Sequence, residues 1–271
     1  MKKFYYILLL MLTLLMINKT DVSAYGFGFK KNYEHRQPEI GRYNEEIAGT
    51  NSYYVGEKNL KNIYLTFDVG YDNGTLSKIL DVLKEKEVKA TFFVTGDFLE
   101  REEELVLRIV NEGHIVGNHT YDHKNITKLS QEALETQIKK IESKYKDITG
   151  KEMEHYFRPP EGEFNKESLM RVSELGYKTF FWSIAYVDWN VNNQKGENYC
   201  YENIMNHLHN GAIILMHTVS SDNASALSRI IDDSRSKGYT FKNLNINNSM
   251  LFKFRNKIKI VKPPITLPSI I

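Results

Sequence analysis

Histidines, carboxylates and an arginine along this chain have the types and spacing of a hydrolytic site. His119 and His123 are four positions apart, which lets two imidazole nitrogens reach one metal ion from a helical turn or a tight loop. Further candidates could supply a base, an acid and the charges that tune them, namely Asp68, Arg158, Asp188 and His217. Because the chain contains eight histidines, the spacing alone is also compatible with two surface histidines.

These candidates share a position relative to the predicted strands. Short β-rich runs alternate with longer helical patterns, and the runs cover 63–67, 90–94, 114–117, 156–158, 179–182, 212–215 and 239–241. Such alternation predicts a parallel sheet. Active sites of parallel β/α folds collect at the carboxyl ends of the strands, where these polar residues fall, so the pattern indicates one shared site. Taken singly, Arg158 could cap a strand end and Asp188 could be an exposed loop charge.

The N-terminus differs in composition from the part of the chain that carries the runs. Two lysines and a short apolar stretch, followed by Val22-Ser23-Ala24, are typical of a secretory signal at 1–24, although an uncleaved anchor is the alternative. Residues 25–58 lack periodicity and are expected to wrap the core or to link it to the signal. The expected parts after the signal are an N-terminal extension at 25–58, the catalytic domain at 59–251 and a basic, proline-containing tail at 252–271.

The charge of the chain does not support a nucleic-acid-binding function. The formal net charge is +2, and loss of the signal would leave the remainder close to neutral. The positively charged side chains of the tail have two explanations: the tail is simply solvated, or it is weakly attracted to an anionic cell wall. Cys200 is the only cysteine, which excludes an intramolecular disulfide and a metal site built from cysteines.

Five segments carry a resemblance to the polysaccharide deacetylase family, whose members contain the NodB homology domain. They are Thr66-Phe67-Asp68, His119-Thr120-Tyr121-Asp122-His123, Arg158-Pro159-Pro160, Asp188-Trp189 and Leu215-Met216-His217. The resemblance implies an α/β fold, a distorted and incomplete (β/α) barrel in which the seven runs are the parallel strands. It also implies a carbohydrate N-deacetylase, a hydrolase that acts on a linear amide bond.

The resemblance implies a role for each matching residue. Asp68 corresponds to the catalytic base and His217 to the general acid. Arg158 would orient Asp68 and keep it ionised, and Asp188 would raise the basicity of His217. A guanidinium lowers the pKa of a carboxylate and a carboxylate favours a protonated imidazole, so physical chemistry agrees. We expect the substrate pocket to be lined by Trp189, Leu215, Pro159 and Tyr71.

The metal-binding part of the pattern departs from the family. Members of the family hold a divalent metal with two histidines and a second aspartate, and Val69 occupies the position of that aspartate here. Three interpretations remain open. His119 and His123 with water hold a weakly bound metal, Asp72 replaces the missing ligand, or the reaction needs little metal. We favour the first, with zinc as the metal.

A wider set of segments resembles a branch of the family that acts on the spore cortex, and these segments are 66–74, 181–183, 187–189, 193–196 and 217–220. In that branch the enzyme removes the acetyl group of N-acetylmuramic acid in peptide-free glycan strands. The freed amine then closes onto the lactyl carboxylate and forms muramic δ-lactam. Lys195 and Arg158 are the candidate hydrogen-bond donors to the lactyl group.

Two other functions remain open on the residues themselves. Deacetylation of N-acetylglucosamine polymers, in chitin-like glycans or peptidoglycan, needs the same chemistry. A non-catalytic wall-glycan-binding module is supported by Val69 and opposed by the presence of Asp68 and His217. The resemblance further implies dependence on an amidase that strips the peptides. We expect a monomer that is secreted to the cell wall or the forespore intermembrane space.

Overall fold

The computed structural model describes residues 24–31 and 33–244. Residues 1–23 of the predicted signal lie outside the described residues. So do the end of the expected catalytic domain, from residue 245, and the basic tail. The strands are Tyr25–Gly26 (β1), Ser52–Tyr53 (β2), Asn62–Val69 (β3), Thr91–Val94 (β4), Ile115–Asn118 (β5), Tyr156–Phe157 (β6), Glu163–Phe164 (β7), Lys178–Phe180 (β8), Ala212–His217 (β9) and Thr240–Phe241 (β10). The helices are Tyr43–Ile47 (α2), Leu76–Glu85 (α3), Gly96–Arg101 (α4), Glu103–Asn111 (α5), Gln131–Thr149 (α6), Lys166–Glu174 (α7), Glu197–Met205 (α8) and Ser221–Ser236 (α9), with 3-10 turns at Ile126–Lys128 (η1) and Pro160–Gly162 (η2).

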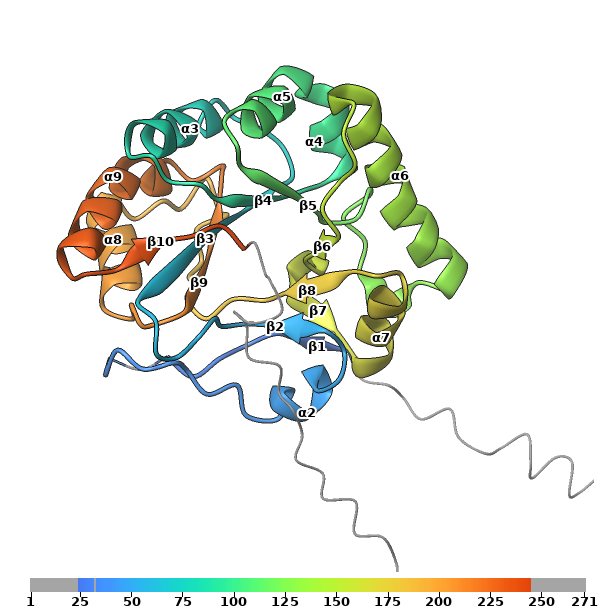
Figure 1. The fold of residues 1–271 in the computed structure, drawn as a ribbon, viewed down its shortest axis with the longest axis horizontal. Coiled ribbons are helices and arrows are strands. Elements are labelled where there is room, and N and C mark those ends of the chain that lie inside the picture. Colours follow the sequence, from blue (N-terminus) through green and yellow to red (C-terminus); the bar gives the residue numbers. More distant parts are fainter. Residues whose placement is uncertain (1–23, 32, 245–271) are drawn as a thin grey trace, which may run out of the picture.

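A curled parallel sheet occupies the centre of the molecule, and helices α3 to α9 surround it (Figure 1). The strand order is β10-β3-β4-β5-β6-β8-β2, and β9 also pairs with β3. On its other side β9 pairs with no further named strand in the described residues, and the isolated bridges Ile184–Ile214 and Val55–Ala212 link it to the segments after β8 and β2. The seven predicted strands are all present as β3, β4, β5, β6, β8, β9 and β10, which confirms the distorted, incomplete (β/α) barrel.

Strand β3 shows how the core directs side chains toward the site. Ile63, Leu65, Phe67 and Val69 alternate along the strand and pack in one hydrophobic cluster with the apolar faces of α3, α5 and α9. The residues between them point to the opposite face of the sheet, because successive side chains of a strand alternate. Asp68 is therefore directed into the curl of the barrel, while the neighbouring Val69 is fully buried in the core.

The N-terminal extension packs as part of the core. Strand β1 pairs with β7, and β2 adds an eighth strand to the sheet by pairing with β8. Phe27 stacks on Phe181 with ring centroids 4.3 Å apart. Two-residue strands carry too little periodicity to be predicted, which is why the sequence indicated wrapping but not pairing. Among the described residues, no helix has the length and apolar character required to span a bilayer.

Candidate active site

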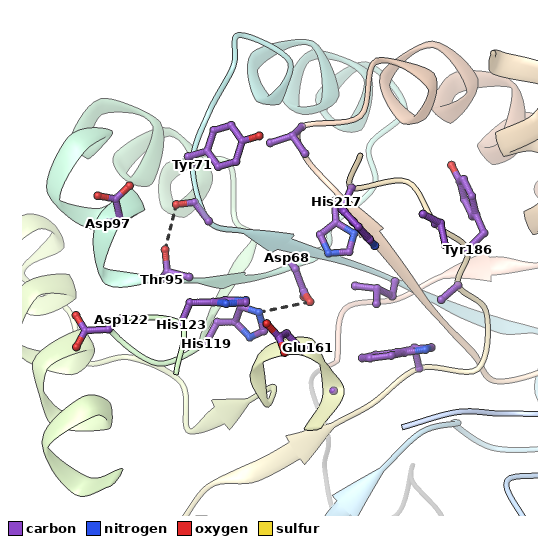
Figure 2. Close-up of a pocket in the computed structure, with 18 of the residues that line it drawn as sticks. Asp68, Tyr71, Thr95, Asp97, His119, Asp122, His123, Glu161, Tyr186 and His217 are labelled. Carbon is purple, nitrogen blue, oxygen red and sulfur yellow. Dashed lines mark hydrogen bonds and ion pairs between the residues drawn. The ribbon is translucent and has the colours of Figure 1, made fainter. Parts of the chain in front are cut away.

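A cavity of about 1400 Å³ opens at the carboxyl ends of the barrel strands. Asp68, His119, His123 and His217 line it, and Figure 2 shows these side chains converging from different segments. The pairing of β3 with β9 places Asp68 directly opposite His217 in the strand register. Residues widely separated in the sequence therefore meet in one site, as the shared position at strand ends predicted.

Arg158 lies behind Asp68 and is completely buried. Its Nη1 donates to Asp68 Oδ1 at 2.8 Å, and its Nε and Nη2 donate to the carbonyl oxygens of Phe180 and Phe181 at 2.9 and 3.3 Å. Burial alone would raise the pKa of Asp68, but the positive charge and hydrogen bond of Arg158, together with the nearby His217, hold that pKa below its usual value. Asp68 is therefore a carboxylate anion at neutral pH.

The geometry also corrects one expectation for Arg158. It was a candidate donor to the lactyl group of a substrate, yet it has no exposed surface and does not line the cavity. All three donor nitrogens already serve Asp68 and two backbone carbonyls. Lys195, the other candidate, is not among the lining residues either, and its ammonium lies 4.7 Å from the ring centroid of Tyr199.

His217 is oriented by Asp188, which lies behind the cavity wall. Nδ1 of His217 donates to Asp188 Oδ1 at 2.7 Å, which leaves Nε2 free of this contact and on the cavity side of the ring. Burial lowers the pKa of His217, but the hydrogen bond and charge of Asp188 outweigh burial and raise that pKa above its ordinary value. The site thus holds an anionic carboxylate and an imidazole that favours its protonated form, a pair that can accept one proton and deliver another.

His119 and His123 lie in a tight loop, and their neutral imidazoles have nitrogen atoms that can ligate a metal. His123 and the intervening Thr120 have left-handed backbone conformations, with φ of 52° and 61°, so the four-residue spacing does not reflect a helix. Nδ1 of His119 donates to the carbonyl of Arg158 at 2.7 Å, which directs its Nε2 toward Asp68 Oδ2, 3.7 Å away. Burial lowers the pKa of His119 to about 4 and also lowers the pKa of His123.

The donor set fits a metal held by two protein nitrogens. The rings of His119 and His123 have centroids 5.0 Å apart, and both line the cavity beside Asp68. Val69 points into the core and offers no ligand. Asp72 does not line the cavity, because its two oxygens accept the backbone N–H groups of Gly74 and Leu76 at the start of α3. In the described part of the chain, no cluster of three or more His, Cys, Asp or Glu is arranged for a metal.

The predicted substrate-pocket residues divide into two groups. Trp189, Leu215 and Tyr71 line the cavity, and Trp189 and Tyr71 are 57% and 47% exposed. Pro159 was expected beside them, but it is buried and absent from the cavity wall. The chain turns immediately after it in η2, so that Glu161 and Gly162 face the cavity instead.

Several cavity residues were not predicted from the sequence. They come from the N-terminal extension, from α4 and from loops after strands, and they include Lys31, Asp97, Glu100, Glu161, Trp182 and Tyr186. Glu161 directly follows the recognised Arg158-Pro159-Pro160 segment, and this proximity was the available signal. Lys31 lies in a segment without periodicity, and no sequence feature linked it to the site.

Comparison with known proteins identifies the same family that the segments of the site resemble. The family model described as Polysaccharide deacetylase matches residues 56–180. The peptidoglycan-N-acetylmuramic acid deacetylase PdaA of Bacillus subtilis is 44% identical over 220 residues, which is 81% of this chain and 84% of that protein. An uncharacterized 30.6 kDa protein of Geobacillus stearothermophilus is 49% identical over 220 residues, covering 81% of this chain and 83% of that protein.

A solved structure extends the likeness to three dimensions. The structure of Bacillus subtilis PdaA, described as a family 4 carbohydrate esterase, superposes with a TM-score of 0.79 at 43% identity. The superposition covers 82% of this chain and 95% of the PdaA chain. On fold, on the extent of identity and on the gathered acid–base residues, the chain belongs to the polysaccharide deacetylase family.

Proposed function

We propose that this protein is a peptidoglycan deacetylase that hydrolyses the N-acetyl group of N-acetylmuramic acid in peptide-free glycan strands. The observation that carries the proposal is the pair formed by Asp68 and His217, which lie opposite each other in the register and favour opposite charges. The likeness to PdaA, whose name specifies N-acetylmuramic acid, supports the choice of sugar.

Asp68 acts as the base of the reaction. It takes a proton from a water molecule as the water oxygen attacks the acetamide carbonyl carbon. Arg158 keeps Asp68 ionised and fixes its orientation through the 2.8 Å hydrogen bond. His119 and His123 would hold a divalent cation, zinc in this proposal, and that cation would supply Lewis acidity for the carbonyl and would lower the pKa of water.

His217 acts as the general acid in the second half of the reaction. Its protonated Nε2 donates to the amide nitrogen as the C–N bond breaks, which releases acetate and leaves the sugar with a free amine. Asp188 keeps the ring in the orientation required, through the 2.7 Å bond to Nδ1. Leu215 and Trp189 form the apolar part of the cavity wall that receives the acetyl methyl group.

The free amine gives the product its role in the spore cortex. On muramic acid this amine can close onto the neighbouring lactyl carboxylate with loss of water, which forms the δ-lactam. The proposal has three further parts. The signal at 1–24 exports the protein to the cell wall or the forespore intermembrane space. The protein acts as a monomer and depends on an amidase that strips the peptides from the glycan. The supporting features are the signal-like N-terminus and the likeness to PdaA.

Mass spectrometry of glycan digests tests the proposal directly. The purified chain is incubated with peptide-free peptidoglycan strands and, separately, with chitooligosaccharides, each with and without zinc. Loss of acetyl from muramic acid, with dehydration to the lactam, is the expected result. Acetyl loss only from N-acetylglucosamine would assign the chain to the alternative substrate. No mass change on either glycan in the presence of metal would leave a glycan-binding module as the better interpretation.

A further inference from the structure

A buried asparagine links the acid side of the site to helix α9. Asn223 lies in the first turn of α9 and has no exposed surface. Its Nδ2 donates to Asp188 Oδ2 at 2.6 Å and to the backbone carbonyl of His217 at 3.0 Å. Asn223 therefore contacts both members of the pair that handles the proton of the leaving amine, although it does not line the cavity.

The orientation of the Asn223 amide is set by its neighbours. The hydroxyl of Tyr186 and the thiol of Cys200 both donate to its Oδ1, the thiol at 3.3 Å. A flipped amide would direct Oδ1 at a carboxylate and a carbonyl, which can only accept hydrogen bonds. All of these hydrogen bonds can therefore form in one orientation only, the one in which the NH₂ group of Asn223 faces Asp188.

The contact with Asn223 completes the set of hydrogen bonds around Asp188. Oδ1 of Asp188 accepts from Nδ1 of His217, while Oδ2 accepts from the backbone N–H of His217 at 2.8 Å and from Asn223. Asp188 lies in the irregular segment between β8 and α8, outside any strand ladder. No helix or strand holds Asp188 in place, so the hydrogen bonds that its carboxylate accepts fix the plane of that carboxylate.

We propose that Asn223 is a positioning residue for deacetylation, which holds the Asp188 carboxylate in the plane where Oδ1 meets His217 Nδ1. It acts through Asp188 and touches no substrate. The inference rests on the proposed function in one respect, the role of His217 as general acid. The arrangement of Asp188 itself can be measured without substrate.

The first test observes the hydrogen bond between His217 and Asp188 directly. Proton NMR of the wild-type chain is expected to show a downfield Nδ1–H resonance that disappears in Asp188→Asn. In Asn223→Ala this resonance should broaden or move upfield. An unchanged resonance in a folded Asn223→Ala protein would overturn the proposal, whatever its activity. Asn223→Ser is the second variant, for use where the alanine variant does not fold.

The second test uses a double-mutant cycle on turnover. Asn223→Ala should lower kcat about tenfold with KM unchanged, the scale typical of residues that orient a catalytic side chain. If Asn223 acts through Asp188, adding Asn223→Ala to Asp188→Asn should cause no further loss. Losses that multiply in the double variant would overturn the proposal. Asn198→Ala is the matched control, because it removes an exposed asparagine amide from the first turn of α8 that contacts Arg229 and neither Asp188 nor His217.

The two tests separate the inference from the proposed function. An inactive wild-type chain whose Nδ1–H resonance depends on Asn223 would refute the deacetylase function and support the positioning role. An active wild-type chain whose resonance and kcat are insensitive to Asn223 would support the function and refute the positioning role.

Discussion

Asp68 and His217 owe their different charge states to different partners, although they face the same cavity. A buried guanidinium stabilises the carboxylate, and a buried carboxylate stabilises the protonated imidazole. Because Arg158 and Asp188 lie behind the cavity wall, both can tune the reacting groups without occupying space that the glycan needs. Tuning and substrate contact are thus performed by separate residues in this site.

Replacement of the base tests the first of these pairs. Asp68→Asn should lower turnover by about 100- to 10,000-fold, the range typical of general-base loss. It should also cost about 3–5 kcal/mol of stability, since Arg158 would remain buried without a counter-charge. Steady-state kinetics and urea unfolding measure the two effects, with the exposed Asp147→Asn as a control. Full turnover in the Asp68 variant would exclude its role as base.

Replacement of Asp188 tests the second pair through the pH profile. Activity requires protonated His217, so activity is present below the pKa of His217 and is lost as pH rises through it. In Asp188→Asn the partner that raises the pKa is removed while burial still lowers it, so the alkaline limb should move to lower pH. The measurement is kcat/KM against pH. A limb that stays in place would show that another group controls it.

Metal removal tests the two-histidine site. Because Val69 and Asp72 supply no ligand, we expect a weakly bound metal that is lost on dialysis against a chelator, with activity restored by added zinc or cobalt. His119→Ala should weaken the binding of cobalt followed by its absorption spectrum. Full activity in chelator would contradict this expectation and favour a reaction with little need for metal.

The residue types in the site could largely be predicted from the sequence, but the partners of some residues could not. Asp72 looked like a possible ligand because of its nearness to Asp68 along the chain, yet local backbone amides take both its oxygens. Asn223 carried no signal, since an asparagine near a helix start is explained equally well by capping. Such roles depend on contacts between distant segments, which one sequence does not reveal.

At the scale of elements, the 3-10 turn η2 shapes the cavity wall next to the recognised Arg158-Pro159-Pro160 segment. Gly162 in this turn has φ of 66°, and a Cβ there would lie 2.6 Å from a ring carbon of Trp182. Gly162→Ala should therefore displace Trp182 and destabilise the protein by about 1–3 kcal/mol. Urea unfolding measures the loss, and Gly26→Ala is the control because its Cβ would meet nothing within 4 Å. Equal stability of the two variants would refute this account.

The strands of the barrel differ in how well the sequence predicts them. The predicted runs were recognisable because parallel strands covered on both faces are almost continuously apolar, as β4 shows with four buried residues. Strands β1, β2 and β7 have two residues each, and tertiary pairing rather than local pattern defines them. The curl of the sheet was supplied by family resemblance, because periodicity does not distinguish a barrel from an open sheet.

At the scale of the whole molecule, the N-terminal extension contributes to stability. Phe27 is 7% exposed and packs against Phe181 and Phe164. Phe27→Ala should cost about 3–5 kcal/mol, the loss typical of a buried aromatic residue. Leu60→Ala, at a position that is 42% exposed, should change stability by less than about 0.5 kcal/mol. Similar melting temperatures for both variants would show that the extension is only loosely attached.

The pairing of β3 with β9 has a consequence for the order in which activity can arise. Thr66 donates to the carbonyl of Ile214 across 148 positions, and the same pairing of β3 with β9, two residues further along, places Asp68 opposite His217. Contacts between such distant segments form late, because the entropy of closing the intervening loop must be lost first. A nascent or unfolded chain therefore has no complete acid–base pair. Activity would therefore appear only after β9 has paired with β3, so that hydrolysis begins only once the chain has folded.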